Sequence, residues 1–275
     1  MSRSHSGFRC LTFCWLLPQD STFWEANCNP DYANCAAFAP SGVLLKAMLI
    51  NSGQGITEYD DWGQDTVLPT QPLSSPPDYF QGYGRVLLNN VLSVDGINDF
   101  DLFVLDSYAV DSDSTIELTV AVTDTSVPLR VTMSWYDPPT SAYTSKQVLH
   151  DLDLLVVAPD GTTTFWGNDV EFGDEYNNNE KVLIEAPVAG TYTIKVHAYP
   201  LTESTFQQIA LVITSGGEVS GPTTGATWDY SIEDRACNDN ELKLNLIDLG
   251  VAEYFSTWGL GKFLTISDKN TDEIV

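Results

Sequence analysis

The sequence predicts a mainly β protein, an antiparallel jelly-roll-like sandwich preceded by two helices. Between residues 96 and 216, apolar and polar side chains alternate with the period of two that half-buried strands show. Turn signals separate these runs, as at 137–139 (DPP), 159–161 (PDG) and 187–190 (PVAG). About eight short strands at such spacing are typical of sandwiches and jelly rolls.

The first helix is predicted over residues 43–50. Ser41 is a suitable N-cap, and Gly53 stands where the helix would end. The segment is apolar nearly all round, so we expect the helix to be buried, against polypeptide that this chain lacks. Residues 81–92 predict a turn that leads into a second short helix.

The strands are predicted from their inward-facing residues. These are Ile116, Leu118, Val120, Val122, Val131, Met133, Trp135, Leu152, Leu154, Val156, Tyr192, Ile194, Val196, Ile209, Leu211 and Ile213. The residues that alternate with them, such as Thr115, Glu117, Thr119, Ala121, Thr132 and Ser134, are expected to point the other way. His197 shares the polar side of its strand with Lys195, so we expect a surface histidine.

The chain divides into four stretches. Residues 1–35 are irregular and have the character of a mis-assigned N-terminus, and residues 36–95 carry the helices. The sandwich is expected over 96–216. Residues 217–275 are expected to be a linker and a tail; a Gly/Ser/Thr/Pro-rich linker runs from Gly216 to Gly225, and the rest has no clear period.

Charge excludes some classes of partner. The chain has 12 Lys and Arg against 38 Asp and Glu, a formal net charge of -26. Such a surface repels phosphate backbones, which argues against a nucleic-acid partner. It is compatible with hard cations, although most of these carboxylates are expected to be simply solvated. No run of about 18 apolar residues is present, so no membrane span is expected.

Cysteines and histidines give one disulfide candidate and no zinc site. Cys28 and Cys35 bracket a short polar loop and could close a small disulfide in an oxidising compartment. The histidines His5, His150 and His197 are not placed for zinc, which needs paired ligands.

No complete catalytic group is found. A serine hydrolase needs a nucleophile, a nearby base and a group that orients the base. His150 could pair with Asp151, but no Gly-x-Ser-x-Gly motif presents a serine.

A calcium site is predicted around residues 150–180. Asp151 and Asp153 lie on one face of a strand, roughly 7 Å apart, where two unshielded carboxylates would repel each other. A cation between strand and loops would relieve this repulsion. The predicted oxygen ligands are Asp151, Asp153, Asn168, Asp169, Asn179 and Glu180. The alternative is that these are exposed turn residues that bind nothing.

Several of these segments resemble the subtilisin-like serine proteases (subtilases). Residues 39–50 (APSGVLLKAMLI) and 81–86 (QGYGRV) resemble the two helices that close the subtilase catalytic domain. The β block resembles the barrel-like C-terminal domain of some extracellular subtilases, which is related to proprotein-convertase P domains. The matching segments are 131–135, 151–154, 158–161, 167–169, 178–180, 186–187 and 190–194.

The resemblance implies proteolysis by an Asp/His/Ser triad, but no triad motif is present in this chain. Ser4, Ser6 and Ser21 lack the context of the family's nucleophile, so no catalytic residue is carried over. The resemblance also implies structural calcium, protein or peptide substrates for the catalytic part, and an extracellular or secretory location.

Three hypotheses follow. The first is that the chain is the C-terminal portion of a secreted subtilisin-like endopeptidase, catalytically incomplete as written; it predicts aggregation unless residues 36–95 are removed. The second is a stand-alone, non-catalytic, calcium-stabilised sandwich that acts as a binding or accessory module. The third, a carbohydrate-binding jelly roll, rests on fold analogy and on aromatic residues such as Trp166 and Tyr176.

Overall fold

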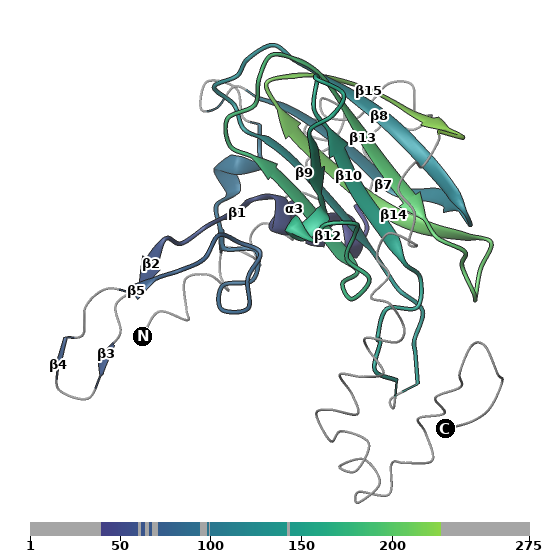
Figure 1. The fold of residues 1–275 in the computed structure, drawn as a ribbon, viewed down its shortest axis with the longest axis horizontal. Coiled ribbons are helices and arrows are strands. Elements are labelled where there is room, and N and C mark those ends of the chain that lie inside the picture. Colours follow the sequence, from purple (N-terminus) through teal and green to yellow (C-terminus); the bar gives the residue numbers. More distant parts are fainter. Residues whose placement is uncertain are drawn as a thin grey trace, which may run out of the picture. The chain divides into compact units, whose positions relative to one another are not determined.

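In the part of the chain that the structure describes, the fold is an antiparallel β-sandwich with the helix α3 on an outer face (Figure 1). The computed structural model describes residues 40–59, 62–63, 66–67, 71–93, 98, 100–141 and 144–226. The expectations for residues 1–35, for a Cys28–Cys35 disulfide and for the tail beyond 226 lie outside the described residues. Among the described residues, none of the helices has the length and apolar character needed to cross a membrane.

Two sheets form the sandwich. The four-stranded sheet has the order β12-β9-β14-β7. Its strands are β7 (Asp101–Asp111), β9 (Leu129–Trp135), β12 (Asn179–Ile184) and β14 (Phe206–Ser215). The five-stranded sheet has the order β11-β10-β13-β8-β15. Its strands are β8 (Ser114–Val122), β10 (Leu152–Val157), β11 (Thr164–Trp166), β13 (Gly190–Ala198) and β15 (Gly217–Thr224).

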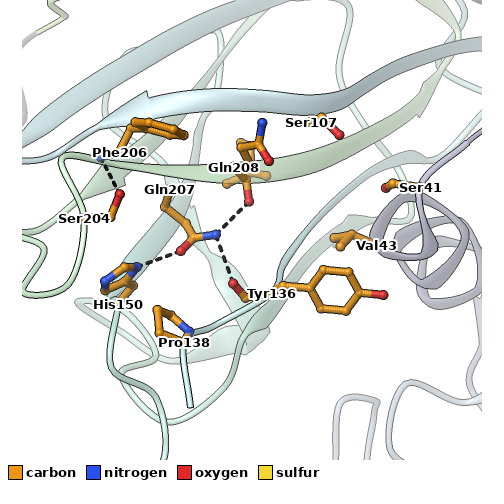
Figure 2. A pocket seen from close by; sticks show the side chains of 11 residues that line it. Ser41, Val43, Ser107, Tyr136, Pro138, His150, Ser204, Phe206, Gln207 and Gln208 are labelled. Carbon is orange, nitrogen blue, oxygen red and sulfur yellow. Dashed lines mark hydrogen bonds between the residues drawn. The ribbon is translucent and has the colours of Figure 1, made fainter. Parts of the chain in front are cut away.

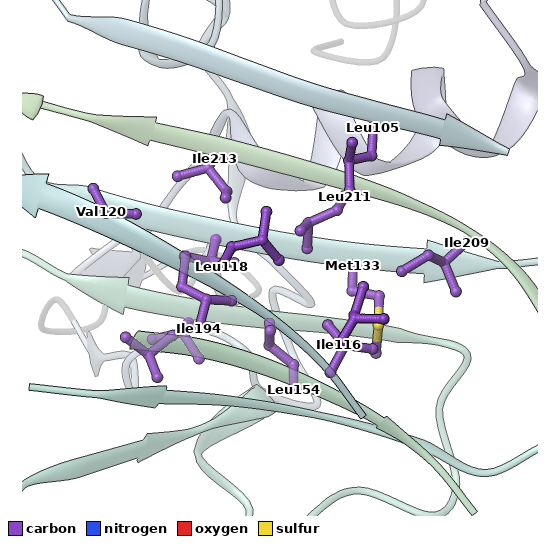
Figure 3. Packing of buried hydrophobic residues seen from close by; sticks show 14 of the residues in the cluster. Leu105, Ile116, Leu118, Val120, Met133, Leu154, Ile194, Ile209, Leu211 and Ile213 are labelled. Atoms are coloured by element: carbon purple, nitrogen blue, oxygen red, sulfur yellow. The ribbon is translucent and has the colours of Figure 1, made fainter. Parts of the chain in front are cut away.

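The core lies between the sheets, where the predicted inward-facing residues meet (Figure 3). All of these residues are at most 2% exposed. Ile116 and Leu118 on β8 belong to the same cluster as Met133 on β9 and Leu211 on β14. Burial of this apolar surface is the main favourable contribution to the stability of the sandwich. The period-two prediction of the strands is therefore confirmed.

Helix α3 (Gly42–Asn51) covers the outer face of the four-stranded sheet. Leu44, Ala47 and Met48 are fully buried, in a second cluster that includes Val104 and Val212 of the sheet. The expectation that the helix needs a partner outside this chain is therefore wrong. Its partner is a sheet that follows it in the sequence.

Polar contacts fix both ends of α3. Ser41 caps the first turn, accepting from the Leu44 N–H at 3.0 Å, and it donates its own N–H and hydroxyl to the Asp106 carboxylate. At the other end, Lys181 Nζ on β12 donates to the carbonyl oxygens of Ile50 (3.0 Å) and Gly53 (2.9 Å). Ile50 lies in the last turn of the helix, where carbonyl groups lack full intrahelical partners, and Gly53 begins the strand that follows.

The segment after α3 contains several short ladders. The two-residue strands pair as β1 (Gly53–Gln54) with β6 (Arg85–Val86), β2 (Glu58–Tyr59) with β5 (Gln71–Pro72), and β3 (Trp62–Gly63) with β4 (Thr66–Val67). The second predicted helix is present only as a 3₁₀ turn, η2 (Leu88–Asn90). An isolated segment this short rarely sustains an α-helix without extensive packing.

Two further expectations are corrected. The segment 216–225, expected to be a linker, contains β15, which pairs with β8 in the five-stranded sheet. His197, expected on the surface, is only 6% exposed, and its Nδ1 lies 3.0 Å from the Thr115 hydroxyl. The aromatic ring of Tyr199 packs edge-on against its imidazole, with the centroids 4.6 Å apart.

Candidate functional site

A group of four acidic side chains, here called the carboxylate cluster, lies where β10 packs against β12. It consists of Asp151, Asp153, Asp174 and Glu180. Asp151 and Asp153 flank the first residue of β10, Glu180 lies on β12, and Asp174 follows the 3₁₀ turn η3 (Gly167–Asp169) in the chain. The packing of β10 against β12 and η3 brings them together from distant parts of the sequence.

Glu180 is the most deeply buried member, with no exposed surface. Its Oε2 accepts the backbone N–H of Leu154 at 2.7 Å. Its Oε1 is buried and has no hydrogen-bond partner among the described residues. Burial raises the pKa of Glu180 well above its ordinary value, and the negative charges of Asp153, Asp174 and Asp151 raise it further.

Gly167 shapes the space around this carboxylate. A Cβ atom at position 167 would collide with Oε2 of Glu180. Only glycine therefore lets the backbone of η3 pass this close to the carboxylate. The glycine at position 167 thus makes room for the buried carboxylate of Glu180.

The other carboxylates have partners of different kinds. Tyr199 Oη donates to Asp153 at 3.0 Å, and Asp153 is fully buried. Lys146 Nζ lies 3.4 Å from Asp151 and 3.0 Å from Glu175. These two contacts are the ion pairs found within the described part of the chain. One lysine thus faces several carboxylates.

Asp174 is held by the loop around it and is 5% exposed. It accepts the side-chain amides of Asn168 and Asn177, each at 2.7 Å, and the backbone N–H of Tyr176 at 3.0 Å. Sequence reasoning missed Asp174 as a site residue. The available signal was its position between two predicted ligand segments, 167–169 and 178–180.

The two predicted asparagines differ in what they can offer. Asn168 has a left-handed backbone (φ 56) and is fully engaged, because its oxygen accepts the Lys181 N–H at 3.1 Å and its amide donates to Asp174 and to the Asn179 carbonyl. Asn179 donates to Asn178 at 3.0 Å, and its own Oδ1 is buried with no partner among the described residues.

Asp169 is not part of the cluster. Its side chain is exposed and lines a separate cavity of about 460 Å³ that is also lined by Lys181 and Glu185. The structure therefore brings together Asp151, Asp153 and Glu180 of the predicted ligands and adds Asp174, to which Asn168 is bonded. The Asn179 side chain lies on the face of β12 opposite to Glu180, because Asn179 pairs with Ser134 and Glu180 with Met133. Asp169 lies elsewhere.

The donor set suits a hard cation. It offers carboxylate and amide oxygens without sulfur or imidazole, which is the preference of Ca²⁺. The buried Oε1 of Glu180 needs a positive or hydrogen-donating partner. As the side chains stand, no three His, Cys, Asp or Glu residues of the described ranges are arranged so that they could hold one ion. An ion would have to draw the carboxylates towards itself.

The histidines give no catalytic arrangement. His150 is 1% exposed and contacts Gln207, with its Nδ1 2.7 Å from the amide oxygen, and no bond to Asp151 is found. Burial lowers the pKa of His197 to about 4, which keeps its imidazole neutral. Both imidazoles are shielded from solvent, so neither could meet a substrate in this form.

Trp166, proposed above as a sugar platform, is 8% exposed and packs against Phe172, with ring centroids 5.8 Å apart. Its face is therefore not open to a ligand, whereas Tyr176 is 65% exposed.

Comparison with known proteins gives one informative similarity. No family model matches the chain. The "Serine protease/ABC transporter B family protein tagA" of Dictyostelium discoideum is 22% identical over 195 residues. The alignment covers 66% of this chain and 10% of the Dictyostelium protein, so the chain spans about a tenth of the relative it matches. The similarity supports a relationship to a protein named as a serine protease and goes no further.

Proposed function

We propose that this chain supplies the non-catalytic sandwich portion of a secreted subtilisin-like serine endopeptidase. The observation that carries the proposal is the similarity over 195 residues to a protein named as a serine protease. The ordered series of subtilase-like segments between 36 and 216 supports it. On this proposal, protein or peptide substrates are cleaved by a catalytic part that carries the triad.

The geometry supports a non-catalytic role for the described residues. His150 and His197 are inside the protein, and the hydroxyl beside His197 belongs to Thr115, which is 3% exposed. A nucleophile must reach the substrate, so this pair cannot serve as one. We therefore expect the purified 275-residue chain to leave casein intact.

The proposal is tested on the native protein. An antibody against the sandwich is used to isolate the protein from its source cells and medium, and the product is treated with a fluorophosphonate probe that labels active serines. We expect the isolated polypeptide to be labelled and to yield peptides of a subtilase catalytic domain by mass spectrometry. An unlabelled polypeptide without such peptides would contradict the proposal.

We further propose that the carboxylate cluster binds calcium as a structural ion. Asp151, Asp153, Asp174 and Glu180 would hold it. The ion supplies positive charge that offsets the repulsion among buried carboxylates. Asn168 positions Asp174 and the start of β12 and does not need to contact the ion itself.

The second candidate function is a stand-alone, calcium-stabilised binding or accessory module. One observation favours it: α3 packs on the sandwich of its own chain. The apolar residues on the outer face of the four-stranded sheet are therefore covered by a helix of the same chain. The isolation experiment separates the two candidates, because a stand-alone module would carry no serine-reactive label.

A further inference from the structure

A small cavity of about 270 Å³ lies where the N-terminal end of α3 meets β14 and the loop after β9 (Figure 2). It is distinct from the carboxylate cluster. Ser41 lines one side, Tyr136 and Phe206 provide aromatic rings, and His150, Gln207 and Gln208 provide polar groups. Its volume is close to the low end for ligand pockets, so it suits one small ring rather than an extended ligand.

Two aromatic side chains are held open at this cavity. Tyr136 is 67% exposed and Phe206 is 43% exposed, although Tyr136 follows and Phe206 begins a strand whose other large hydrophobic residues are buried. The position of Tyr136 depends on Gly42, because a Cβ there would lie 2.6 Å from the Tyr136 hydroxyl oxygen. The first residue of α3 is thus a glycine that allows the exposed ring to lie against the helix.

A hydrogen-bonded pair forms the polar part of the cavity. Gln207 Nε2 donates to the backbone carbonyl oxygens of Tyr136 (3.1 Å) and Gln208 (2.9 Å), which fixes the orientation of the amide. Its Oε1 must then accept from His150, so Nδ1 of His150 carries the hydrogen. Nε2 of His150 is left as a buried acceptor with no partner among the described residues.

None of the side chains that line the cavity is charged. Two carboxylates close to the cavity already accept hydrogen bonds from the protein itself. Asp106 accepts from the N–H and hydroxyl of Ser41, and Asp137 accepts the backbone N–H groups of Leu149 (2.7 Å) and His150 (2.8 Å). In a chain with 38 acidic residues, this cavity is a neutral, aromatic and hydrogen-bonding spot.

We propose that this cavity binds one ring of a neutral carbohydrate. A sugar ring offers apolar C–H faces to the rings of Tyr136 and Phe206 and hydroxyl groups to polar atoms. The Gln208 amide and the Tyr136 hydroxyl are exposed at the cavity and can exchange hydrogen bonds with such hydroxyls. A charged ligand would find no side chain of opposite charge here, and a purely apolar one would leave these polar groups without partners.

The test measures binding to the full 275-residue chain by ligand-observed NMR. The ligands are the methyl glycosides of glucose, galactose, mannose and N-acetylglucosamine. We expect at least one glycoside to bind with a dissociation constant of about 1–10 mM, the range open to a ligand of this size. Tyr136→Ala should raise that constant about tenfold or more. Gly42→Ala keeps the ring but displaces it, and should weaken binding severalfold.

Phe80→Ala is the matched control, because Phe80 is an 84% exposed aromatic residue that does not line the cavity. It should leave binding unchanged, and thermal unfolding of each variant checks that the fold is kept. Absence of binding by all four glycosides up to about 50 mM would overturn the proposal. So would binding that survives Tyr136→Ala, or tighter occupation of the cavity by free indole than by any glycoside.

Discussion

At the scale of single residues, Glu180 is the strongest feature of the chain. A carboxylate with no exposed surface, one unpartnered oxygen and acidic neighbours is costly to ionise. Because the folded-state pKa is raised, this residue favours folding below its ordinary pKa of 4.5, and that contribution is lost as the pH rises towards the folded-state value. A bound cation would reverse the cost at neutral pH.

Glu180→Gln should separate these two situations. The amide can still accept the Leu154 N–H but carries no charge. In chelator at pH 7 we expect the variant to gain about 1–3 kcal/mol in the free energy of unfolding, measured with urea, and to lose most of the stabilisation by calcium. Glu218→Gln, at an exposed position on β15, is the control and should change little. A variant that is strongly destabilised in chelator would show that the carboxylate is compensated without an ion.

Lys181 gives a second dependence on pH. Its pKa is lowered to about 7, mainly by burial and also by the positive charge of Arg130, while the negative charge of Glu185 acts in the opposite direction. The unfolded chain therefore binds a proton at Lys181 between pH 10.5 and about 7, whereas the folded chain does not. The free energy of unfolding should fall over this range as the pH falls, by up to about 4 kcal/mol.

Lys181→Met should remove this pH dependence. At high pH the variant should be less stable by about 1–3 kcal/mol, because the carbonyl groups of Ile50 and Gly53 lose their donor. Urea unfolding at several pH values measures both effects. Lys195→Met on β13 serves as the control. If the wild-type and Lys181→Met curves run parallel from pH 10.5 to 7, the amine is protonated in the folded state and the account of Lys181 is wrong.

At the scale of elements, α3 and the four-stranded sheet act as one packed unit. Met48 has no exposed surface and belongs to the cluster formed with the sheet. We expect Met48→Ala to cost about 2–5 kcal/mol in the free energy of unfolding, whereas Lys46→Ala on the exposed side of the same helix should stay within about 0.5 kcal/mol. Equal effects of the two substitutions would mean that the helix does not dock as described.

Removal of residues 36–95 gives a larger test of the same contact. The truncation uncovers Leu102, Val104, Ala210 and Val212 on the outer face of the sheet. We expect the truncated chain to be less soluble than the full chain, measured by size-exclusion chromatography, because an exposed apolar patch promotes association. A truncated chain that is monomeric and more soluble would favour the opposite expectation, in which the helix is the exposed surface.

The sequence predicted the strands well because the residues of the core between the sheets recur at every second position. It could not show that the polar residues of the four-stranded sheet are also covered. Thr132 and Ser134 are fully buried beneath α3, and Asn51 at the end of the helix bonds to Thr132 and Thr214 there. Small polar residues are compatible with either side of a sheet, so a period-two pattern cannot detect a helix packed on it.

The missed strand and the misplaced histidine have similar causes. β15 contains Gly217, Gly221 and Pro222, a composition that favours loops, and only pairing with β8 makes it a strand. His197 lies on the polar side of β13, but Thr115 and Tyr199 close over it. Both outcomes depend on neighbours that are distant in the sequence.

At the scale of the whole molecule, the net charge is -26, and some of the acidic side chains are buried together rather than exposed to solvent. The carboxylate cluster concentrates four acidic side chains where β10 packs against β12, and Lys146 forms an ion pair with one of them, Asp151. The sequence predicted the segments that meet there, but not which carboxylates are buried. That depends on how the chain places β10, β12 and η3, which no local pattern records.

The most direct test of calcium binding by the carboxylate cluster compares the melting temperature of the full chain in chelator and in millimolar calcium. Near-ultraviolet circular dichroism monitors the unfolding. If the cluster binds calcium only in the folded state, calcium should raise the melting temperature by several degrees, and magnesium at the same concentration should raise it less. Identical melting temperatures in chelator and in calcium would contradict the account.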